Sequence, residues 1–429
     1  MQIHSMPQTL AEKILSRAAR KASVHPGEIV TCQVDLAMIH DSGGPRRVGP
    51  IIRRLGVPVR DPERVVVITD HYVPTFDADS KQILALTREW VRAQGISRFH
   101  DQQGICHVVL PEQGHLQPGT LVVGGDSHSP TGGAFGCYMF GVGATEMAGV
   151  LATGEIWIRV PETIRLEWRG AFAPGVVAKD VMLFLCGKLG MDGGRYQAVE
   201  YAGEAIGAFS MQERMTLSNM TAELGGQAGL VAPDEQTAAW LRERGADPGD
   251  WSKWQSDPDA AVAEHHVFDA SQLTPQVAAP HSPANSAAVE KFASVVPDVL
   301  YLGACTGAKL EDLRAAARLL QNRKIRTGLE FWVAPASVKD REQAKQEGTL
   351  SLLEEAGAKL LPTACGLCAG YGPQRLGPGQ VCLSSTARNF KGRMGDPSAQ
   401  VYLASPLTLA ATALAGRIAD PREFLKDVA

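Results

Sequence analysis

The sequence predicts an α/β protein whose parallel-rich sheets are covered by helices and divided over several domains. Short apolar runs alternate with amphipathic helical patterns, which is the arrangement that buries a parallel sheet on both faces. The 429 residues include 44 glycines, and only 6% are aromatic, as expected for many tight strand-to-helix turns. The length exceeds the roughly 100–200 residues of one domain, so more than one domain is expected.

Four apolar runs are predicted to be strands, because each is short, rich in aliphatic residues and ends at a polar residue or a turn former. They span 64–69, 121–125, 299–303 and 329–334. Polar residues follow directly after several of these runs. In open α/β sheets, ligands bind beyond the carboxyl ends of the strands, so this placement is a first indication of an enzyme.

Three further segments have recognisable patterns. Leu310, Leu313 and Leu320 fall on one face of a predicted helix over 310–320. The alternating apolar and basic residues of 11–21 predict a short surface helix. The uncharged stretch 399–416 contains Pro406, which fits a buried strand, a turn and a buried helix better than a helix that spans a bilayer.

We predict three domains: an α/β domain over 1–160, a second α/β domain over 161–287 and a third over 288–429. The first junction is placed at Pro161. The second is placed near 285–290, because turn formers and charged residues accumulate before it.

The composition excludes several classes of protein. With 45% hydrophobic and 21% charged residues the chain is globular rather than disordered. Its 42 Lys and Arg against 46 Asp and Glu give a net charge of −4, which argues against a general nucleic-acid binder. The N-terminus has no signal-like apolar block, so the expected location is the cytoplasm. A chain of this length does not need disulfides, and its eight cysteines are expected to be reduced or metal-bound.

The most informative motif is Cys365-Gly-Leu-Cys368, with Cys305 about sixty residues earlier. A Cys-x-x-Cys pair can be a redox dithiol, half of a zinc site or part of an iron–sulfur site. Its flanks are irregular and glycine-rich, which favours wrapping around a metal group. Cys305 lies between a predicted strand and a helix, where the helix N-terminus favours a thiolate. A metal or cluster site and a structural role are about equally favoured.

Histidines with neighbouring acids form a second group: Asp70-His71, His107 and Asp126-Ser-His128. An Asp beside a His fixes the imidazole tautomer and raises its basicity. A lone His after a strand is more often structural, but three such sites within sixty residues make a catalytic role as plausible as a structural one.

Two polar groups are weaker signals. Arg388 and Arg393 flank a glycine and could reach one carboxylate from a loop, although a solvated basic turn is the simpler interpretation. Asn219 and Glu223 are four residues apart on a predicted helix and would point in one direction. Surface polarity explains that pair equally well.

Taken together, the motifs resemble those of the aconitase superfamily, most closely the large subunits of 3-isopropylmalate dehydratases and homoaconitases. The resemblance covers nearly the whole chain. It is carried by ordered motifs that include His40-Asp41, Asp70-His71, Gly104-Ile-Cys-His107, Gly125-Asp-Ser-His128, Ala178-Lys-Asp-Val181, Cys365-Gly-Leu-Cys368 and Arg388-Asn-Phe-Lys-Gly-Arg393. It implies a three-domain α/β/α core without the swivel domain of the family, and an iron–sulfur hydro-lyase.

The resemblance also implies a cofactor, one [4Fe–4S] cluster per chain. Cys305, Cys365 and Cys368 match the family's three ligands, which leave one iron without a protein ligand. Such an iron can act as a Lewis acid toward the hydroxyl and carboxylate of a small 2-hydroxy di- or tricarboxylate.

Roles for the other residues follow from the same resemblance. The pairs Asp70–His71 and Asp126–His128 would protonate the leaving hydroxyl or orient water, and His107 would line the same pocket. The remaining matches would catalyse the reaction or bind substrate beside the cluster; they are Glu223 as a catalytic residue and His40, Asn219, Arg388 and Arg393 as substrate-binding residues.

The catalytic base of the superfamily is not matched. In relatives it is a serine in a Gly-Ser-Ser-Arg loop on the swivel domain, whereas Ser384-Ser385 precede Thr386 here. The chain also ends where the three-domain core would end. We therefore expect a separate small subunit to supply the base, and no membrane or nucleic-acid partner.

Two segments depart from the family pattern. Cys305 is followed by Thr306-Gly-Ala-Lys309 where relatives have Thr-Asn-Gly-Arg, and Ala387 replaces an asparagine. These changes favour a specialised paralogue, acting on maleate, citraconate, methylmalate, homocitrate or a phosphonate analogue, over the enzyme of leucine synthesis. A zinc or redox protein that uses Cys365 and Cys368, and an RNA-binding regulator, are the remaining alternatives.

Overall fold

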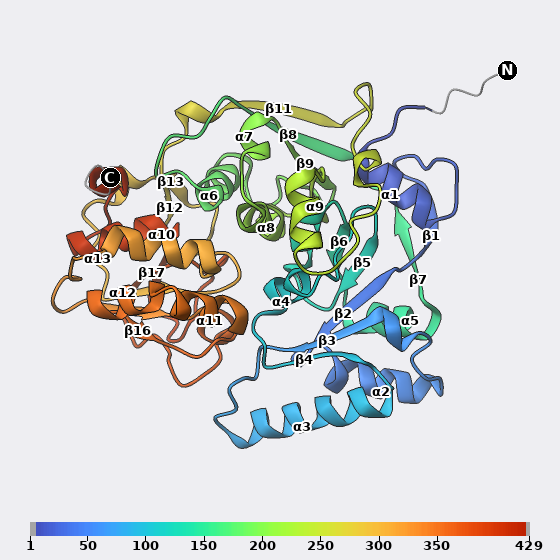
Figure 1. Cartoon of the computed structure of the whole chain (residues 1–429), viewed down its shortest axis with the longest axis horizontal. Coiled ribbons are helices and arrows are strands. Elements are labelled where there is room, and N and C mark those ends of the chain that lie inside the picture. The colour runs from blue at the N-terminus through green and yellow to red at the C-terminus, as the bar shows by residue number, and fades with distance from the viewer. Residues whose placement is uncertain (1–5, 426–429) are drawn as a thin grey trace.

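The structure is a computed structural model that describes residues 6–425. Three parallel-rich sheets form its framework, and Figure 1 shows helices packed around them. This confirms the predicted α/β class with parallel-rich sheets. No helix in the described part of the chain is both long and apolar enough to cross a membrane.

The first sheet is fully parallel, with the strand order β4-β3-β2-β5-β6. Its strands are β2 (Leu36–His40), β3 (Val65–Thr69), β4 (Arg98–Asp101), β5 (Leu121–Gly124) and β6 (Tyr138–Gly141). Its helices are α1 (Leu10–Ala18), α2 (Pro45–Leu55), α3 (Ala78–Ala93), α4 (Cys106–Glu112) and α5 (Ala144–Thr153). An antiparallel pair of strands, β1 (Ile29–Gln33) and β7 (Glu155–Arg159), lies beside it.

The sheet is buried on both faces at its centre, which explains why β3 is an almost continuous apolar run. Along β3, Val65 and Val67 belong to the core under α1, α2, α3 and α5. Val66 and Ile68 point to the other face, into a core that contains α4 residues. Successive strand residues alternate between faces, so these four positions all carry apolar side chains, and only Thr69 at the end of the strand is polar.

The second sheet, with the order β10-β9-β8-β11, is also parallel. Its strands are β8 (Thr163–Arg169), β9 (Ala198–Ala202), β10 (Ala228–Val231) and β11 (Glu264–Asp269). The helices of this region are α6 (Ala178–Leu189), α7 (Glu204–Gly207), α8 (Met211–Met220) and α9 (Glu235–Arg242). Helix α8 packs against the 3₁₀ turn η2 (Ser129–Phe135) of the first region.

The third sheet has the order β13-β12-β18-β17-β14-β15-β16, and only β12 runs antiparallel to its neighbours. Its strands are β12 (Gln276–Ala278), β13 (Ser286–Ala288), β14 (Val299–Leu302), β15 (Glu330–Val333), β16 (Lys359–Leu360), β17 (Val381–Ser384) and β18 (Gln400–Ala404). Its helices are α10 (Leu310–Leu320), α11 (Val338–Gln346), α12 (Thr349–Ala356) and α13 (Pro406–Ala415), followed by the short α14 (Arg422–Leu425).

The predicted elements agree with the structure to within one residue at their ends, except that the N-terminal helix, predicted over 11–21, ends three residues earlier, at Ala18. The four strands correspond to β3, β5, β14 and β15, and the helix over 310–320 is α10. The stretch 399–416 forms β18, a turn and the buried helix α13. The N-terminal helix is α1, but its apolar face is in the core rather than on the surface.

The three predicted domains stay a prediction. The sheet to which each strand belongs shows where the junctions fall relative to the three sheets. Strand β7 ends at Arg159 and the second sheet begins at Thr163, on either side of Pro161. Strand β12 already pairs with β18 of the third sheet, so that sheet begins at Gln276, ahead of the proposed junction.

Candidate functional site

The carboxyl ends of strands from the first and third sheets open on one cavity of about 280 Å³. The residues that line it are Asp70, His71, Ile105, His107, Asp126, Ser127, His128, Ala304, Cys305, Cys365, Cys368, Ala369, Ala387, Arg388 and Arg393. We call the side from the first sheet the carboxylate–imidazole wall (Asp70, His71, His107, Asp126 and His128). The side from the third sheet is the thiol wall (Cys305, Cys365, Cys368, Arg388 and Arg393).

Asp70 and His71 at the end of β3 form an ion pair, with Asp70 Oδ1 2.6 Å from His71 Nδ1. The other oxygen of Asp70 accepts a hydrogen bond of 2.8 Å from the backbone N–H of Cys106. Burial lowers the pKa of His71, but the adjacent Asp70 outweighs that effect and raises the pKa to about 10. The same pairing outweighs burial at Asp70 and lowers its pKa. His71 is therefore an imidazolium at neutral pH, with its Nδ1 proton held by Asp70.

Asp41 holds this pair in place. Its carboxylate accepts backbone hydrogen bonds from Asp70, His71 and Tyr72 at 3.2, 3.0 and 2.7 Å. These bonds fix the turn that follows β3, so the direction of the His71 ring is set by the backbone as well as by Asp70.

His40 stacks on His71 with ring centroids 4.3 Å apart, yet its ring is neutral whereas that of His71 is charged. Its Nδ1 accepts from the backbone N–H of Ser42 at 3.2 Å, and its Nε2 lies 3.0 Å from the carbonyl oxygen of Gly125. One nitrogen must accept and the other must donate, which defines a neutral imidazole. Burial and the neighbouring His71 lower the pKa of His40.

Asp126 lies between two imidazoles. Its Oδ1 is 2.8 Å from His107 Nε2 and 3.5 Å from His128 Nδ1. The expected Asp126–His128 pair is therefore present, but the closer ring is that of His107. Burial raises the pKa of Asp126, and His107 with His128 outweighs it, so that the pKa is well below its ordinary value.

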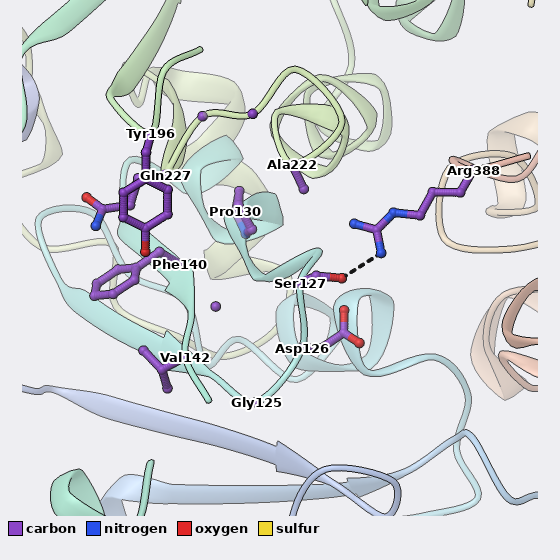
Figure 2. Close-up of a pocket in the computed structure, with 13 residues that line it drawn as sticks. Gly125, Asp126, Ser127, Pro130, Phe140, Val142, Tyr196, Ala222, Gln227 and Arg388 are labelled. Atoms are coloured by element: carbon purple, nitrogen blue, oxygen red, sulfur yellow. Dashed lines mark hydrogen bonds between the residues drawn. The ribbon is translucent and has the colours of Figure 1, made fainter. Parts of the chain in front are cut away.

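Glu223 links the two walls from behind. Its Oε1 is 3.1 Å from His128 Nε2 and 2.5 Å from Arg388 Nε. Arg388 also donates to Ser127 Oγ at 2.9 Å, and Figure 2 shows this bond as a dashed line at the edge of a neighbouring pocket. Although burial lowers the pKa of His128, the carboxylates of Asp126 and Glu223 raise it overall.

The three cysteines of the thiol wall come from two loops. Cys305 follows β14 through Ala304, whose φ of 69° is unusual for a residue other than glycine. Cys365 and Cys368 lie around the 3₁₀ turn Gly366–Ala369, and the Cys365 N–H bonds to the Asp70 carbonyl at 2.9 Å. That bond joins the thiol wall directly to the end of β3.

Three cysteines line this one cavity, and thiolates are the ligands by which proteins hold iron–sulfur clusters. Asn219 donates to Cys305 Sγ at 3.1 Å and leaves its buried Oδ1 without a partner. Arg393 Nε is likewise buried without a partner within residues 6–425. Each of these two buried atoms is available for a hydrogen bond with a polar group that the described residues do not supply.

The thiols differ in acidity. Burial, followed by the charge of Cys368, raises the pKa of Cys305 to about 12. A hydrogen bond from Cys365, together with the nearby Arg393, lowers the pKa of Cys368 to about 5 despite its burial. Of the three thiols, Cys368 is the one whose surroundings favour the thiolate, which is the form that binds metals.

Two larger cavities lie beside this one and share Asp126 and Ser127 with its lining. One, of about 390 Å³, is lined by Phe140, Val142, Tyr196 and Gln227 among others, and Figure 2 shows their side chains beside the Ser127–Arg388 bond. The other, of about 300 Å³, contains His40.

Several sequence predictions are refined by these positions. Asn219 is on α8, but Glu223 lies three residues beyond the helix end, and both are buried rather than solvated. His40 lines the neighbouring cavity, not the one with the cysteines. Ser384 and Ser385 are fully buried, and Ser385 Oγ is hydrogen-bonded to Gly303, so neither serine can act as a base.

Sequence reasoning missed three contributors. Ser127 could have been found, because it stands inside the Asp126-Ser-His128 motif. Asp41 stood next to His40 in a matched motif, but its bonds to a distant turn gave no local signal. Lys179 also belongs to a matched motif, but no local signal indicated that its side chain reaches the loop of Cys305.

Comparisons with known proteins show what the whole chain is similar to. The model of the aconitase family (aconitate hydratase) matches residues 12–299 and 293–416. A probable 3-isopropylmalate dehydratase large subunit of Methanothermobacter thermautotrophicus is 44% identical, covering 97% of this chain and 99% of the relative.

Two other relatives extend the comparison. The 3-isopropylmalate dehydratase large subunit of Aquifex aeolicus is 41% identical over 98% of each chain. A probable methanogen homoaconitase large subunit of M. thermautotrophicus is 41% identical over 96% of this chain and 97% of its own. The solved structure of Thermococcus kodakaraensis aconitase X shares the fold with a TM-score of 0.50 at 12% identity, covering 86% of this chain and 89% of its own.

Proposed function

This chain belongs to the aconitase family, and from that premise we propose that it is the large subunit of an iron–sulfur hydro-lyase. Its substrate would be a small 2-hydroxy di- or tricarboxylate, as the names of its relatives indicate. The observation that carries the proposal is the single cavity in which three cysteines, two arginines and two carboxylate–imidazole groups meet.

Cys305, Cys365 and Cys368 would hold a [4Fe–4S] cluster, one per chain. Three protein ligands leave one iron open, and when bound the cluster supplies a Lewis acid for a substrate hydroxyl and carboxylate. The orphaned buried atoms of Asn219 and Arg393 support this assignment.

Residues of the carboxylate–imidazole wall would donate the proton that the leaving hydroxyl takes up and would orient water. His71 carries a proton that Asp70 keeps on the ring at neutral pH, so its Nε2–H can be donated toward the cavity. Asp126, held by His107 and the His128 backbone, stays ionised and can orient a water. Glu223 acts through His128 and Arg388, whose positions it determines.

Arginines of the thiol wall would bind the substrate's carboxylates. Arg388 and Arg393 both line the cavity, and Arg393 Nε has no partner among the described residues. A guanidinium can bind a carboxylate through two parallel hydrogen bonds. His40 and Asn219, next to the cavity, would complete the binding site from the sides.

The proton on the carbon beside a carboxylate would be removed by a base on a partner. We propose a serine on the swivel domain of a separate small subunit, which would cover the open spaces seen beside Ser127. The names of the relatives, all large subunits, support such a partner. The eight free cysteines fit a reducing compartment such as the cytoplasm.

Residues around Cys305 and Arg388 bear on the substrate. Ala387 lines the cavity where the family has an asparagine, and Thr306 and Lys309 are buried directly behind Cys305. This favours, as a second candidate, a paralogue specialised for maleate, citraconate, methylmalate, homocitrate or a phosphonate analogue.

The test is anaerobic reconstitution of the chain with iron, sulfide and the small subunit encoded beside it. Unsaturated diacids are then added one at a time, and hydration is followed by the loss of ultraviolet absorbance. We expect turnover of one diacid that needs both chains. A reconstituted pair that hydrates none of them, or that turns over without iron, would contradict the proposal.

A further inference from the structure

Lys179 is a buried lysine of α6 that belongs to neither wall of the cavity. Only 1% of its surface is exposed. Its Nζ lies 3.3 Å from Thr306 Oγ1, 3.1 Å from the Ser385 carbonyl and 2.6 Å from the Thr386 carbonyl. Thr306 follows Cys305 directly, so the ammonium group reaches from the second sheet's region to the loop of a cluster ligand.

The partners of Lys179 are all neutral oxygens. Within residues 6–425 no carboxylate pairs with its ammonium group. Lys309, the other buried lysine near Cys305, is different, because its Nζ is 2.8 Å from Asp312 Oδ2. An ammonium buried without a directly paired carboxylate is costly, so a further negative charge nearby, beyond that of Glu223, would stabilise it.

The surrounding backbone brings Lys179 close to the thiol wall. Gly307 packs so tightly on Ser385 that a Cβ there would be 2.2 Å from Ser385 Cβ. The loop of Cys305 and the segment before Arg388 therefore touch, and Lys179 binds both. Burial lowers the pKa of Lys179 to about 8, while Cys305 and Cys368 act in the opposite direction, as groups of opposite charge near the ammonium do.

We propose that Lys179 is a positioning residue that serves as the counter-charge of the thiolate-bound cluster and raises its reduction potential. This inference rests on the proposed cluster. Adding an electron makes the cluster more negative, and a nearby positive charge in a water-poor interior stabilises that state. Removing the charge therefore makes reduction harder.

The decisive variant is Lys179→Gln, because glutamine keeps N–H donors for the carbonyls of Ser385 and Thr386 but has no charge. Lys179→Arg keeps the charge. Lys188→Gln is the matched control, since Lys188 is an exposed lysine on the same helix, about 13 Å along its axis. Each reconstituted variant is titrated with dithionite in the presence of mediators, and the reduced cluster is measured by EPR.

At a fixed potential we expect the reduced-to-oxidised ratio to fall at least tenfold in Lys179→Gln, which is a shift of about −59 mV for one electron. Lys179→Arg and Lys188→Gln should stay within threefold of the unmodified protein. A potential unchanged in Lys179→Gln overturns the inference. So does a failure of this variant to fold without the cluster, which would show a purely structural role. If the unmodified protein binds no cluster, the proposed function fails instead.

Discussion

The two walls of the cavity differ in how many of their polar groups are hydrogen-bonded within the chain. On the carboxylate–imidazole wall, the polar groups are held by other groups of the chain, as Asp70 is by His71 and Cys106. On the thiol wall, Arg393 Nε has no partner in the described residues. The first wall is therefore held by bonds within the chain. The thiol wall is held only in part, because Arg388 bonds to Glu223 and Ser127 whereas Arg393 Nε, among residues 6–425, stays free for a ligand. This difference supports our proposal that the cofactor and the substrate lie on the thiol side and that the proton chemistry takes place on the other.

The largest effect should follow from breaking the thiol wall. Cys365→Ala removes one of three ligands, so bound iron should fall below about a tenth of normal. Turnover should fall on the order of 10³-fold or more, because the Lewis acid supplies several kcal/mol. Iron analysis and hydration assays measure both. Cys382→Ala is the control, since Cys382 is buried in the neighbouring strand β17 and should keep its iron. Equal iron in both variants would contradict the ligand assignment.

Asp70→Asn breaks the carboxylate–imidazole wall while leaving the thiol wall intact. An amide cannot hold His71 as an imidazolium, so kcat should fall by about 10²–10⁴-fold with bound iron unchanged. The high-pH limb of the kcat profile should also move to lower pH. Asp101→Asn, which alters a carboxylate paired with Arg88 at the end of β4, should change kcat little. A normal kcat in Asp70→Asn would remove this pair from the mechanism.

Arg393→Gln tests whether this guanidinium, which interacts with Cys368 and whose Nε has no partner in the described residues, also binds a substrate carboxylate. A hydrogen bond to a charged group contributes about 1.5–3 kcal/mol, so KM should rise about 10- to 100-fold while kcat changes much less. Lys391→Gln changes an exposed charge of the same loop and should leave KM as it is. If kcat falls and KM does not change, Arg393 acts on the cluster or the transition state instead.

The smallest effect concerns stability. The pKa of His71 is raised to about 10 in the folded protein, from about 6.5 in an unfolded chain. Its contribution is fully present below about pH 6.5 and is lost as the pH rises through about 10. The unfolding temperature of His71→Gln should thus be lower than normal near pH 6, and the difference should shrink as the pH rises and vanish above about pH 10.5. The exposed His265→Gln is the control, and a pH-independent gap would contradict the ion pair.

The sequence predicted the elements of the fold well because their signals are local. Four apolar runs became β3, β5, β14 and β15, and the heptad-like spacing of leucines became α10. It also identified the residues of both walls, through motifs and a family resemblance. It could not predict which imidazole Asp126 contacts most closely, because His107 comes from a different element. The bond from Lys179 to Ser385 spans 206 residues, and no local pattern encodes such a contact.

The central claim is that three cysteines bind a cluster with one open iron, which acts on substrate only with a partner's base. Iron and acid-labile sulfide should be measured on the anaerobically reconstituted chain, with Mössbauer spectra before and after addition of the diacid that the enzyme pair converts. We predict about four irons and four sulfides per chain, and a spectrum in which one iron site alone changes on substrate binding. A single zinc or iron ion per chain, or a cluster whose spectrum the substrate leaves unchanged, would contradict the claim.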